Sequence, residues 1–158
     1  MLAIAAVIAA VVFWRTSEYF SHRRLAEGKI GKVRLVHVNP EDAPHESLAV
    51  LDFTLTNDTN HEIVVRSLQP SFDARDGSSV DGNMVAARDI DNIFRNYPDL
   101  GEQYNPPLKA QDVLPPNGSI DREVVVRFDA PQDTFAGRKG VVLRVDTIGG
   151  IVAELKGK

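Results

Sequence analysis

The residues of this chain that could do chemistry are few and widely spaced. No two of its histidines, which are His22, His37, His45 and His61, have the spacing of metal ligands. The absence of cysteine excludes disulfides, thiolate metal sites and cysteine nucleophiles. The sequence holds no Gly-x-Ser-x-Gly elbow and no glycine-rich phosphate loop. It therefore predicts no catalytic residue, no metal site and no cofactor, and we expect a protein that is not an enzyme.

The first 14 residues form an uncharged, apolar segment that predicts a membrane anchor. At about 1.5 Å per residue, a helix over it spans roughly 21 Å of a hydrocarbon core about 30 Å thick. Residues 16–20, local thinning of the bilayer or residues upstream of Met1 could complete the span. A cleaved signal peptide is disfavoured, because no basic residue precedes the segment and bulky residues occupy 13–15, where cleavage needs small ones. We predict a single transmembrane helix over residues 1–20.

Aromatic and basic residues follow the apolar segment and predict a membrane interface, where aromatic rings and cations are favoured. The expected interfacial anchors are Trp14, Arg15, Tyr19, Phe20, Arg23 and Arg24. Residues 21–31 form a basic neck. By the positive-inside rule the neck, and the domain after it, lie in the cytoplasm. A few basic residues before Met1 would reverse the orientation, and a periplasmic domain is the alternative.

Small residues recur four apart within the predicted transmembrane helix. They form two stripes, Ala5 with Ala9 and Ala6 with Ala10. Such stripes let helix backbones approach closely in a membrane, so they favour packing against integral membrane protein subunits. The alternative interpretation is that alanine is merely a tolerated apolar residue in lipid.

The soluble part of the chain is acidic. From Leu35 onward there are 12 Lys and Arg against 20 Asp and Glu. Nucleic acid is therefore excluded as a partner, because affinity for phosphates requires clustered cations. The neck can touch the anionic headgroups of the lipid bilayer, whereas the acidic domain is repelled from them and is expected to dock on another protein.

Residues 32–158 are predicted to be one mostly β domain. In the strand 48–56, Ala49, Leu51, Phe53 and Leu55 alternate with a second set that includes Thr54, which predicts one buried face and one wet face. The remaining predicted strands are 32–39, 63–68, 71–74, a strand from residue 80, 120–129, 140–146 and 151–155. About seven short strands joined by turn residues favour an immunoglobulin-like β-sandwich.

A short helix is predicted between these strands. Ile90, Ile93, Phe94 and Tyr97 have the spacing i, i+3, i+4 and i+7, which forms one apolar stripe along a helix over residues 86–97. Pro98 cannot continue that helix. The helix is an insertion into an otherwise compact order of strands.

A long proline-rich segment, residues 98–118, follows the predicted helix and shows neither helical nor strand periodicity. One interpretation is that helix and loop together cap an open end of the sandwich. The other is that so long a connection carries a binding surface. If the apolar stripe of the helix packs inward, the exposed partner contacts are expected to be Tyr97, Tyr104 and Leu108, with aromatic anchors contributing most of the binding energy.

Three motifs give the domain a family resemblance. Residues 53–57 match F-x-L-x-N at a strand end, Asp76 and Gly77 form an aspartate-glycine turn, and residues 114–119 match L-x-P-x-x-S before a strand. In this order they resemble membrane-anchored, immunoglobulin-like bacterial domains of uncharacterised function, of the type found in Acidobacteria. The resemblance covers residues 28–155 and implies the sandwich fold. It brings no catalytic residues with it, and the inserted helix departs from the plainer members.

Two functions follow as hypotheses. The first is a non-catalytic accessory or structural subunit of a larger membrane protein complex, of respiratory or photosynthetic type, that acts through protein-protein contacts. The second is a free-standing, membrane-tethered envelope domain that binds a protein or ligand through its loops. Purification in mild detergent separates them, because only the first predicts that the chain migrates together with a multi-helix assembly.

Overall fold

The structure, a computed structural model, describes residues 26–36 and 45–158. The predicted transmembrane helix and residues 21–25 of the basic neck lie outside the described residues, together with His22 and His37. The same holds for the expected helix-packing and interfacial residues Ala5, Ala6, Ala9, Ala10, Trp14, Arg15, Tyr19, Phe20, Arg23 and Arg24. Within the described ranges, no helix is long and apolar enough to cross a membrane.

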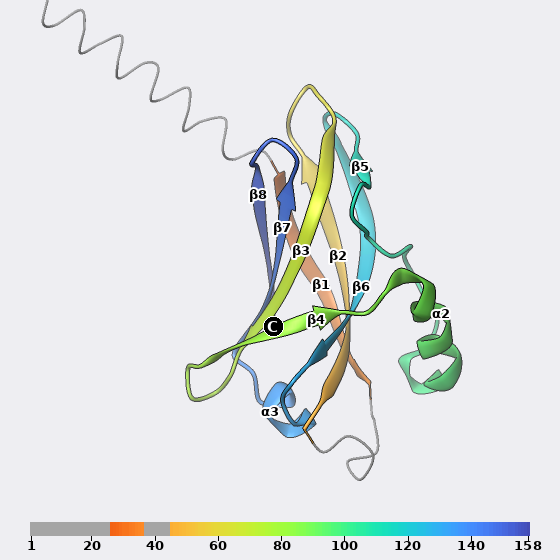
Figure 1. The fold of residues 1–158 in the computed structure, drawn as a ribbon, viewed down its shortest axis with the longest axis vertical. Coiled ribbons are helices and arrows are strands. Elements are labelled where there is room, and N and C mark those ends of the chain that lie inside the picture. Colours follow the sequence, from red (N-terminus) through yellow and green to blue (C-terminus); the bar gives the residue numbers. More distant parts are fainter. Residues whose placement is uncertain (1–25, 37–44) are drawn as a thin grey trace, which may run out of the picture.

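The described chain is mostly β, as predicted (Figure 1). The eight strands are β1 (Ala26–Val36), β2 (Ser47–Asn57), β3 (Ile63–Asp73), β4 (Ser79–Met84), β5 (Val113–Leu114), β6 (Gly118–Phe128), β7 (Gly140–Thr147) and β8 (Val152–Gly157). The helices are α2 (Ala87–Asn96), the 3-10 turn η1 (Pro98–Leu100) and α3 (Gln132–Ala136). The strand order β4-β6-β2-β1-β8-β7-β3 closes through a β3–β4 pairing, so seven strands form one barrel-like sheet. Strand β5 attaches to the first residues of β3.

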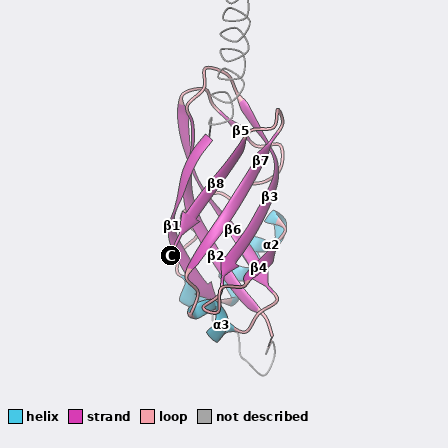
Figure 2. Cartoon of the chain, turned by 90° about the vertical axis from the view of Figure 1, so that its left-hand side faces the viewer, coloured by secondary structure: helices cyan, strands magenta, loops and turns pink. Residues whose placement is uncertain are grey.

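The core inside this barrel follows the predicted alternation. In β2, the side chains of Ala49, Leu51, Phe53 and Leu55 are all buried, whereas Thr54 is exposed. Three aromatic rings fill the end of the barrel next to α3: Phe72 lies edge-on at 5.0 Å from Phe128 and 5.1 Å from Phe135, and the last two stack at 5.1 Å. Figure 2 shows α3 at that lower end of the elongated barrel. The sequence did not predict α3, because five residues are too few to show a helical period.

Strand β3 is one strand where the sequence predicted two. Pro70, which lies between the two predicted strands, is opposite Leu143 of β7. On its other side, β3 begins to pair with β4 only at Ser71. A proline is tolerated there because the missing N–H faces no neighbouring strand.

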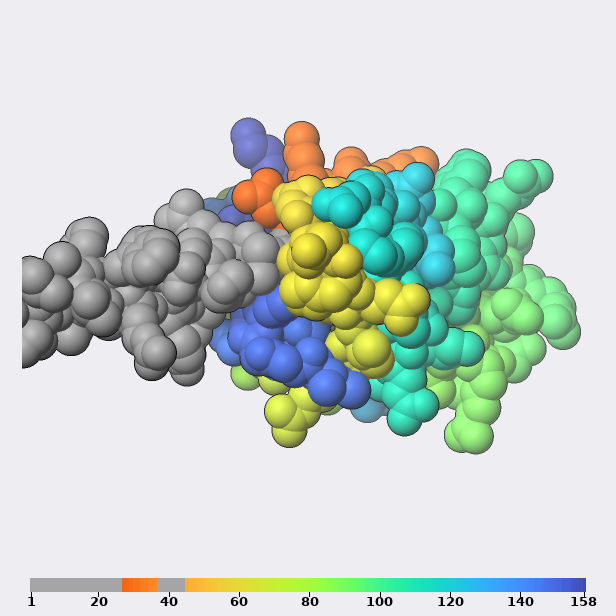
Figure 3. Space-filling view, turned by 90° about the horizontal axis from the view of Figure 1, so that it is seen from above, coloured from red at the N-terminus to blue at the C-terminus, as the bar shows by residue number. Residues whose placement is uncertain are grey.

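Helix α2 and the segment after it cover the outer face of β2 and β6. We call residues 97–112 the crossover, and it leads from α2 to β5. The helix stripe packs inward as predicted, with Ile90 buried and Ile93 and Phe94 half-buried against Val50 and Val125. The outer face of β2 was expected to be exposed to solvent. That expectation is wrong at Val50, because the apolar residues of α2 pack over it and form a second apolar layer. Seen from above, the region of α2, in green, stands out on one side of the barrel (Figure 3).

The crossover also fills an opening in the barrel wall. Strand β4 joins β3 to β6 only at the lower end, through residues 71–73 of β3 and 126–128 of β6. Above that point, Leu108 of the crossover and Leu114 of β5 enter the main core and are buried. Leu108 and Leu114 thus fill a gap in the barrel wall, and the interpretation that helix and loop cap an open end of the sandwich stays a prediction.

Candidate functional site

A buried arginine lies beneath the crossover, on the outer face of β1. A bulge at Gly31 shifts the β1–β2 register. As a result Val33 and Leu35 pack against the core, and Arg34 points outward from the barrel. Without the bulge, the alternation that begins at buried Ile30 would direct Arg34 into the apolar core. The arginine is nevertheless only 8% exposed, because the crossover covers it.

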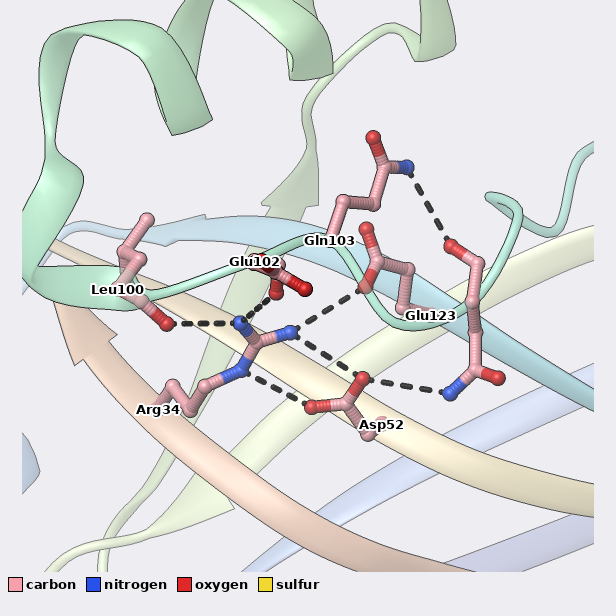
Figure 4. A network of polar contacts seen from close by, with 7 residues as sticks. Arg34, Asp52, Leu100, Glu102, Gln103 and Glu123 are labelled. Atoms are coloured by element: carbon pink, nitrogen blue, oxygen red, sulfur yellow. Dashed lines mark hydrogen bonds and ion pairs between the residues drawn. The ribbon is translucent and has the colours of Figure 1, made fainter.

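The guanidinium of Arg34 makes five hydrogen bonds, one for each of its N–H groups (Figure 4). It donates two to the carboxylate of Asp52, from Nε at 3.0 Å and from Nη2 at 3.2 Å. A third goes from Nη2 to Oε2 of Glu123 at 3.2 Å. Nη1 donates to the backbone carbonyls of Leu100 at 2.9 Å and Glu102 at 3.0 Å. One side chain thus joins β2, β6 and the crossover.

The carboxylates of Asp52 and Glu123 share this single cation. Asp52 is 8% exposed and Glu123 is fully buried, with its Oε1 atom lacking a hydrogen-bond partner. Burial, and next the charge of Asp52, raise the pKa of Glu123 to about 7, although the positive charge of Arg34 lowers it. The outer face of β2 was expected to be exposed to solvent, and the burial of Asp52 contradicts that expectation as well. The cluster changes its charge near neutral pH.

Backbone hydrogen bonds hold the crossover along its length. Beside β6, Leu108 N donates to Glu123 O at 3.0 Å, and Glu123 N donates to Pro106 O at 3.2 Å. Further on, Gln111 N donates to Val65 O at 2.8 Å, and Val65 N donates to Asp112 O at 2.9 Å. The crossover has almost no regular secondary structure, yet side-chain and backbone bonds fix it to four strands, β1, β2, β3 and β6.

Two aromatic rings flank the guanidinium. The Arg34 Cζ atom lies 5.0 Å from the ring centroid of Tyr104 and 5.2 Å from that of Phe94. The ammonium of Lys32 lies 5.3 Å from the Tyr104 centroid. Tyr104 is 60% exposed, whereas Phe94 is half-buried. The cation-π contacts hold the ring of Tyr104 against the barrel while most of it stays open to solvent.

The three predicted partner contacts have different surroundings. Tyr104 is exposed, as expected. Tyr97 is half-buried and packs on the apolar layer beneath α2. Leu108 was expected to be exposed, and this expectation is wrong: its side chain is only 3% exposed, because it fills the opening between β3 and β6 and packs in the core.

The charge cluster was not found from the sequence. Its one signal is a charged residue inside an apolar strand, Asp52 in β2 and Glu123 in β6. The histidines in the described ranges, His45 and His61, are exposed, and no group of metal-binding side chains forms there.

An apolar cavity of about 300 Å³ lies at the barrel opening, between β3, β4, the start of α2 and the crossover. Its walls include Leu68, Met84, Ile90, Leu108 and Val124, and Lys109 is the one charged residue among its lining residues. Val124, which lines the cavity, directly follows Glu123 of the charge cluster in β6. The cavity offers space for a small apolar group.

Comparison with known proteins identifies no family for this chain: no family model and no curated protein match it. Similar solved structures include a candidate lipoprotein, ycdA, from Bacillus subtilis, with a TM-score of 0.49 at 10% identity over 86% of this chain and 37% of that chain. This chain thus spans little more than a third of the ycdA chain. An uncharacterised β-sandwich protein from Clostridium difficile has a TM-score of 0.39 at 13% identity, over 85% and 86% of the two chains. The archaellum periplasmic stator protein FlaG from Sulfolobus acidocaldarius has a TM-score of 0.40 at 12% identity, over 84% and 100%.

Proposed function

We propose that this chain is a non-catalytic, membrane-tethered binding protein that acts as an accessory subunit of a larger membrane protein complex. Its binding surface is formed by α2 and the crossover, with Tyr104 as the central anchor. The observation that carries this proposal is the combination of a firmly held loop with an exposed aromatic ring. Arg34 fixes the crossover backbone at 2.9 and 3.0 Å, and the ring it holds is 60% exposed.

Rigidity of the crossover supports binding because a loop that is already ordered loses little entropy when a partner docks. A segment that merely capped the barrel would need Leu108 and Leu114 in the core, but it would not need a buried ion cluster. Tyrosine is also suited to this position, since it combines a large apolar area with few rotatable bonds.

The topology supports the finer assignment of the fold as an immunoglobulin-like sandwich closed along its edges. Strand β1 pairs antiparallel with β2 and parallel with β8, so it connects the strands β2 and β6 with the strands β8, β7 and β3. Strand β4 makes the second connection between these two groups, because it pairs with both β3 and β6. The proposal places this domain after an anchor at residues 1–20 and a neck at 21–31. The basic neck favours a cytoplasmic domain, with the periplasm as the alternative.

Purification in mild detergent tests the proposed function. The wild-type chain is expected to migrate with integral membrane subunits, and Tyr104→Ala is expected to release it without lowering the melting temperature of the chain. Ile148→Ala is the matched control, because Ile148 is an apolar side chain that is 62% exposed in the β7–β8 turn and belongs neither to α2 nor to the crossover. Equal retention of the two variants in the complex would contradict the proposal.

The apolar cavity favours a second candidate, a free-standing envelope domain that binds a small apolar ligand through its loops. Its volume of about 300 Å³ and the aliphatic side chains that line it suit an apolar ligand of a few carbon atoms. Under this hypothesis the detergent-purified chain runs alone and carries a small apolar molecule that native mass spectrometry detects. Migration with membrane subunits and an empty cavity would favour the first function.

A further inference from the structure

Strand β1 has an open edge beside the end of β8. The two strands pair in parallel at Lys29 and Lys156, and β8 ends at Gly157. From Lys32 to Val36, β1 continues with β2 on one side, and no described strand pairs with its other side. Such an edge presents unpaired backbone N–H and C=O groups and can accept a further strand.

Four lysines flank this edge. Lys29, Lys32, Lys156 and Lys158 line a cleft of about 450 Å³ between the two strands. All four are exposed. Lys29 and Lys156 lie directly opposite each other in register, an arrangement of like charges that destabilises a sheet.

Within the described residues, the one acid that forms an ion pair with this cluster is Glu154, whose Oε2 lies 3.9 Å from Lys156 Nζ, and both side chains are more than half exposed. An ion pair so long and so exposed contributes little. The cluster also contrasts with the rest of the domain, which has 20 Asp and Glu against 12 Lys and Arg from Leu35 onward. A concentration of unneutralised lysines in an acidic domain indicates a surface for an anionic ligand.

The edge is continuous with the crossover surface. The Lys32 ammonium lies 5.3 Å from the centroid of the exposed Tyr104 ring, so a ligand along β1 would reach Tyr104 at Lys32. We propose that the edge of β1 from Lys32 to Leu35, before the buried Val36, binds an extended acidic segment of the partner protein as an added strand. The lysines neutralise its carboxylates and Tyr104 packs on its side chains. This inference rests on the proposed function and names the chemistry of the partner.

Strand addition explains both features of the edge together. Free backbone groups give affinity to any extended chain, and the flanking lysines select an acidic one. An anionic lipid headgroup would use the lysines, but it would not form a ladder of hydrogen bonds with β1. The two ligands therefore differ in how they change amide exchange in residues 32–35.

The test uses the full chain in a neutral detergent and a fluorescein-labelled peptide of ten alternating Glu and Val residues. Fluorescence anisotropy is expected to show binding, and the double variant Lys29→Gln with Lys156→Gln is expected to weaken it on the order of tenfold. Arg127→Gln with Lys139→Gln is the matched control, because both residues are exposed cations outside the cleft and outside the crossover, and it should bind as wild type does. Equal loss in both double variants would overturn the proposal.

Backbone pairing is tested separately. A peptide of the same sequence with alternate amides N-methylated should lose binding, and the unmodified peptide should slow hydrogen exchange in residues 32–35. Equal binding of both peptides would overturn strand addition. Slower exchange with phosphatidylglycerol vesicles and none with the peptide would show a lipid contact instead, and it would overturn the proposal as well.

Retention in the membrane complex separates this inference from the proposed function. Both Tyr104→Ala and the Lys29→Gln, Lys156→Gln variant are expected to lose the complex. If only Tyr104→Ala does so, the acidic strand is refuted and the proposed function stands. If only the lysine variant does so, the anchor role of Tyr104 fails while the edge remains supported.

Discussion

The buried carboxyl of Glu123 makes the stability of the domain depend on pH. Its pKa rises from the usual 4.5 to about 7, first because of burial and then because of the charge of Asp52. Between these pH values the folded chain holds a proton that the unfolded chain has released, so the free energy of unfolding falls as pH rises. Each pKa unit corresponds to about 1.4 kcal/mol, and the full loss is about 3 kcal/mol. The stabilisation is complete below pH 4.5 and is lost above about pH 7.

Replacing Glu123 with glutamine removes this titration and keeps an oxygen that can accept the hydrogen bond from Nη2 of Arg34. We expect Glu123→Gln to match the wild type near pH 5 and to exceed it by up to about 3 kcal/mol at pH 8. Urea unfolding of the detergent-solubilised chain between pH 5 and pH 8, followed by far-ultraviolet circular dichroism, measures the difference. Asp121→Asn is the control, because Asp121 is an exposed acid in the same strand.

The difference between the two proteins is the decisive quantity, because the titration of all other groups cancels in it. A difference that stays constant from pH 5 to pH 8 would refute the reasoning about Glu123. A slope that disappears in Asp121→Asn as well would assign it to the surface charge of β6.

The remaining predictions concern the cluster, the core and the anchor. Arg34→Met leaves two buried carboxylates without a cation and should lower the free energy of unfolding by about 3–5 kcal/mol, with faster proteolysis of the crossover. Phe53→Ala should cost about 2–5 kcal/mol and Thr54→Ala about 0.5 kcal/mol, and equal losses in urea unfolding would contradict the register of β2. Alkaline carbonate should leave the chain in the membrane pellet with residues 1–14 still present by intact-mass analysis, whereas a soluble chain that begins after them would refute the anchor.

The strands that could be predicted are those whose core-facing residues follow a regular two-residue alternation, even where, as in β2 from Ala49 to Phe53, both faces are buried. β2 begins and ends within one residue of its prediction, because Phe53 and its inward neighbours alternate with residues on the other face. The β3–β4 turn was equally clear, since Gly77 has the positive φ of 92° that an aspartate-glycine turn requires. In these elements the local sequence and the tertiary structure favour the same conformation.

The charge cluster could not be predicted, because its members come from distant parts of the chain. Arg34 is separated by 18 residues from Asp52, by 66 from Leu100 and by 89 from Glu123. The orientation of Arg34 depends on the bulge at Gly31, which no local pattern indicated. The burial of Leu108 was missed for a related reason: the gap between β3 and β6 exists only in the folded barrel.

The segment between β4 and β6 combines two roles that the sequence presented as alternatives. Leu108 closes the barrel, which is sufficient for a cap. The bonds from Arg34 to the crossover carbonyls go further, because burying an ion cluster is expensive and apolar side chains of similar size often stabilise such positions more. What an ion cluster gives and an apolar contact does not is direction, since the two hydrogen bonds from Nη1 of Arg34 to the carbonyls of Leu100 and Glu102 fix the path of the backbone there. We infer that the cluster fixes the position of Tyr104. A surface held in one conformation suits binding to a single, permanent partner.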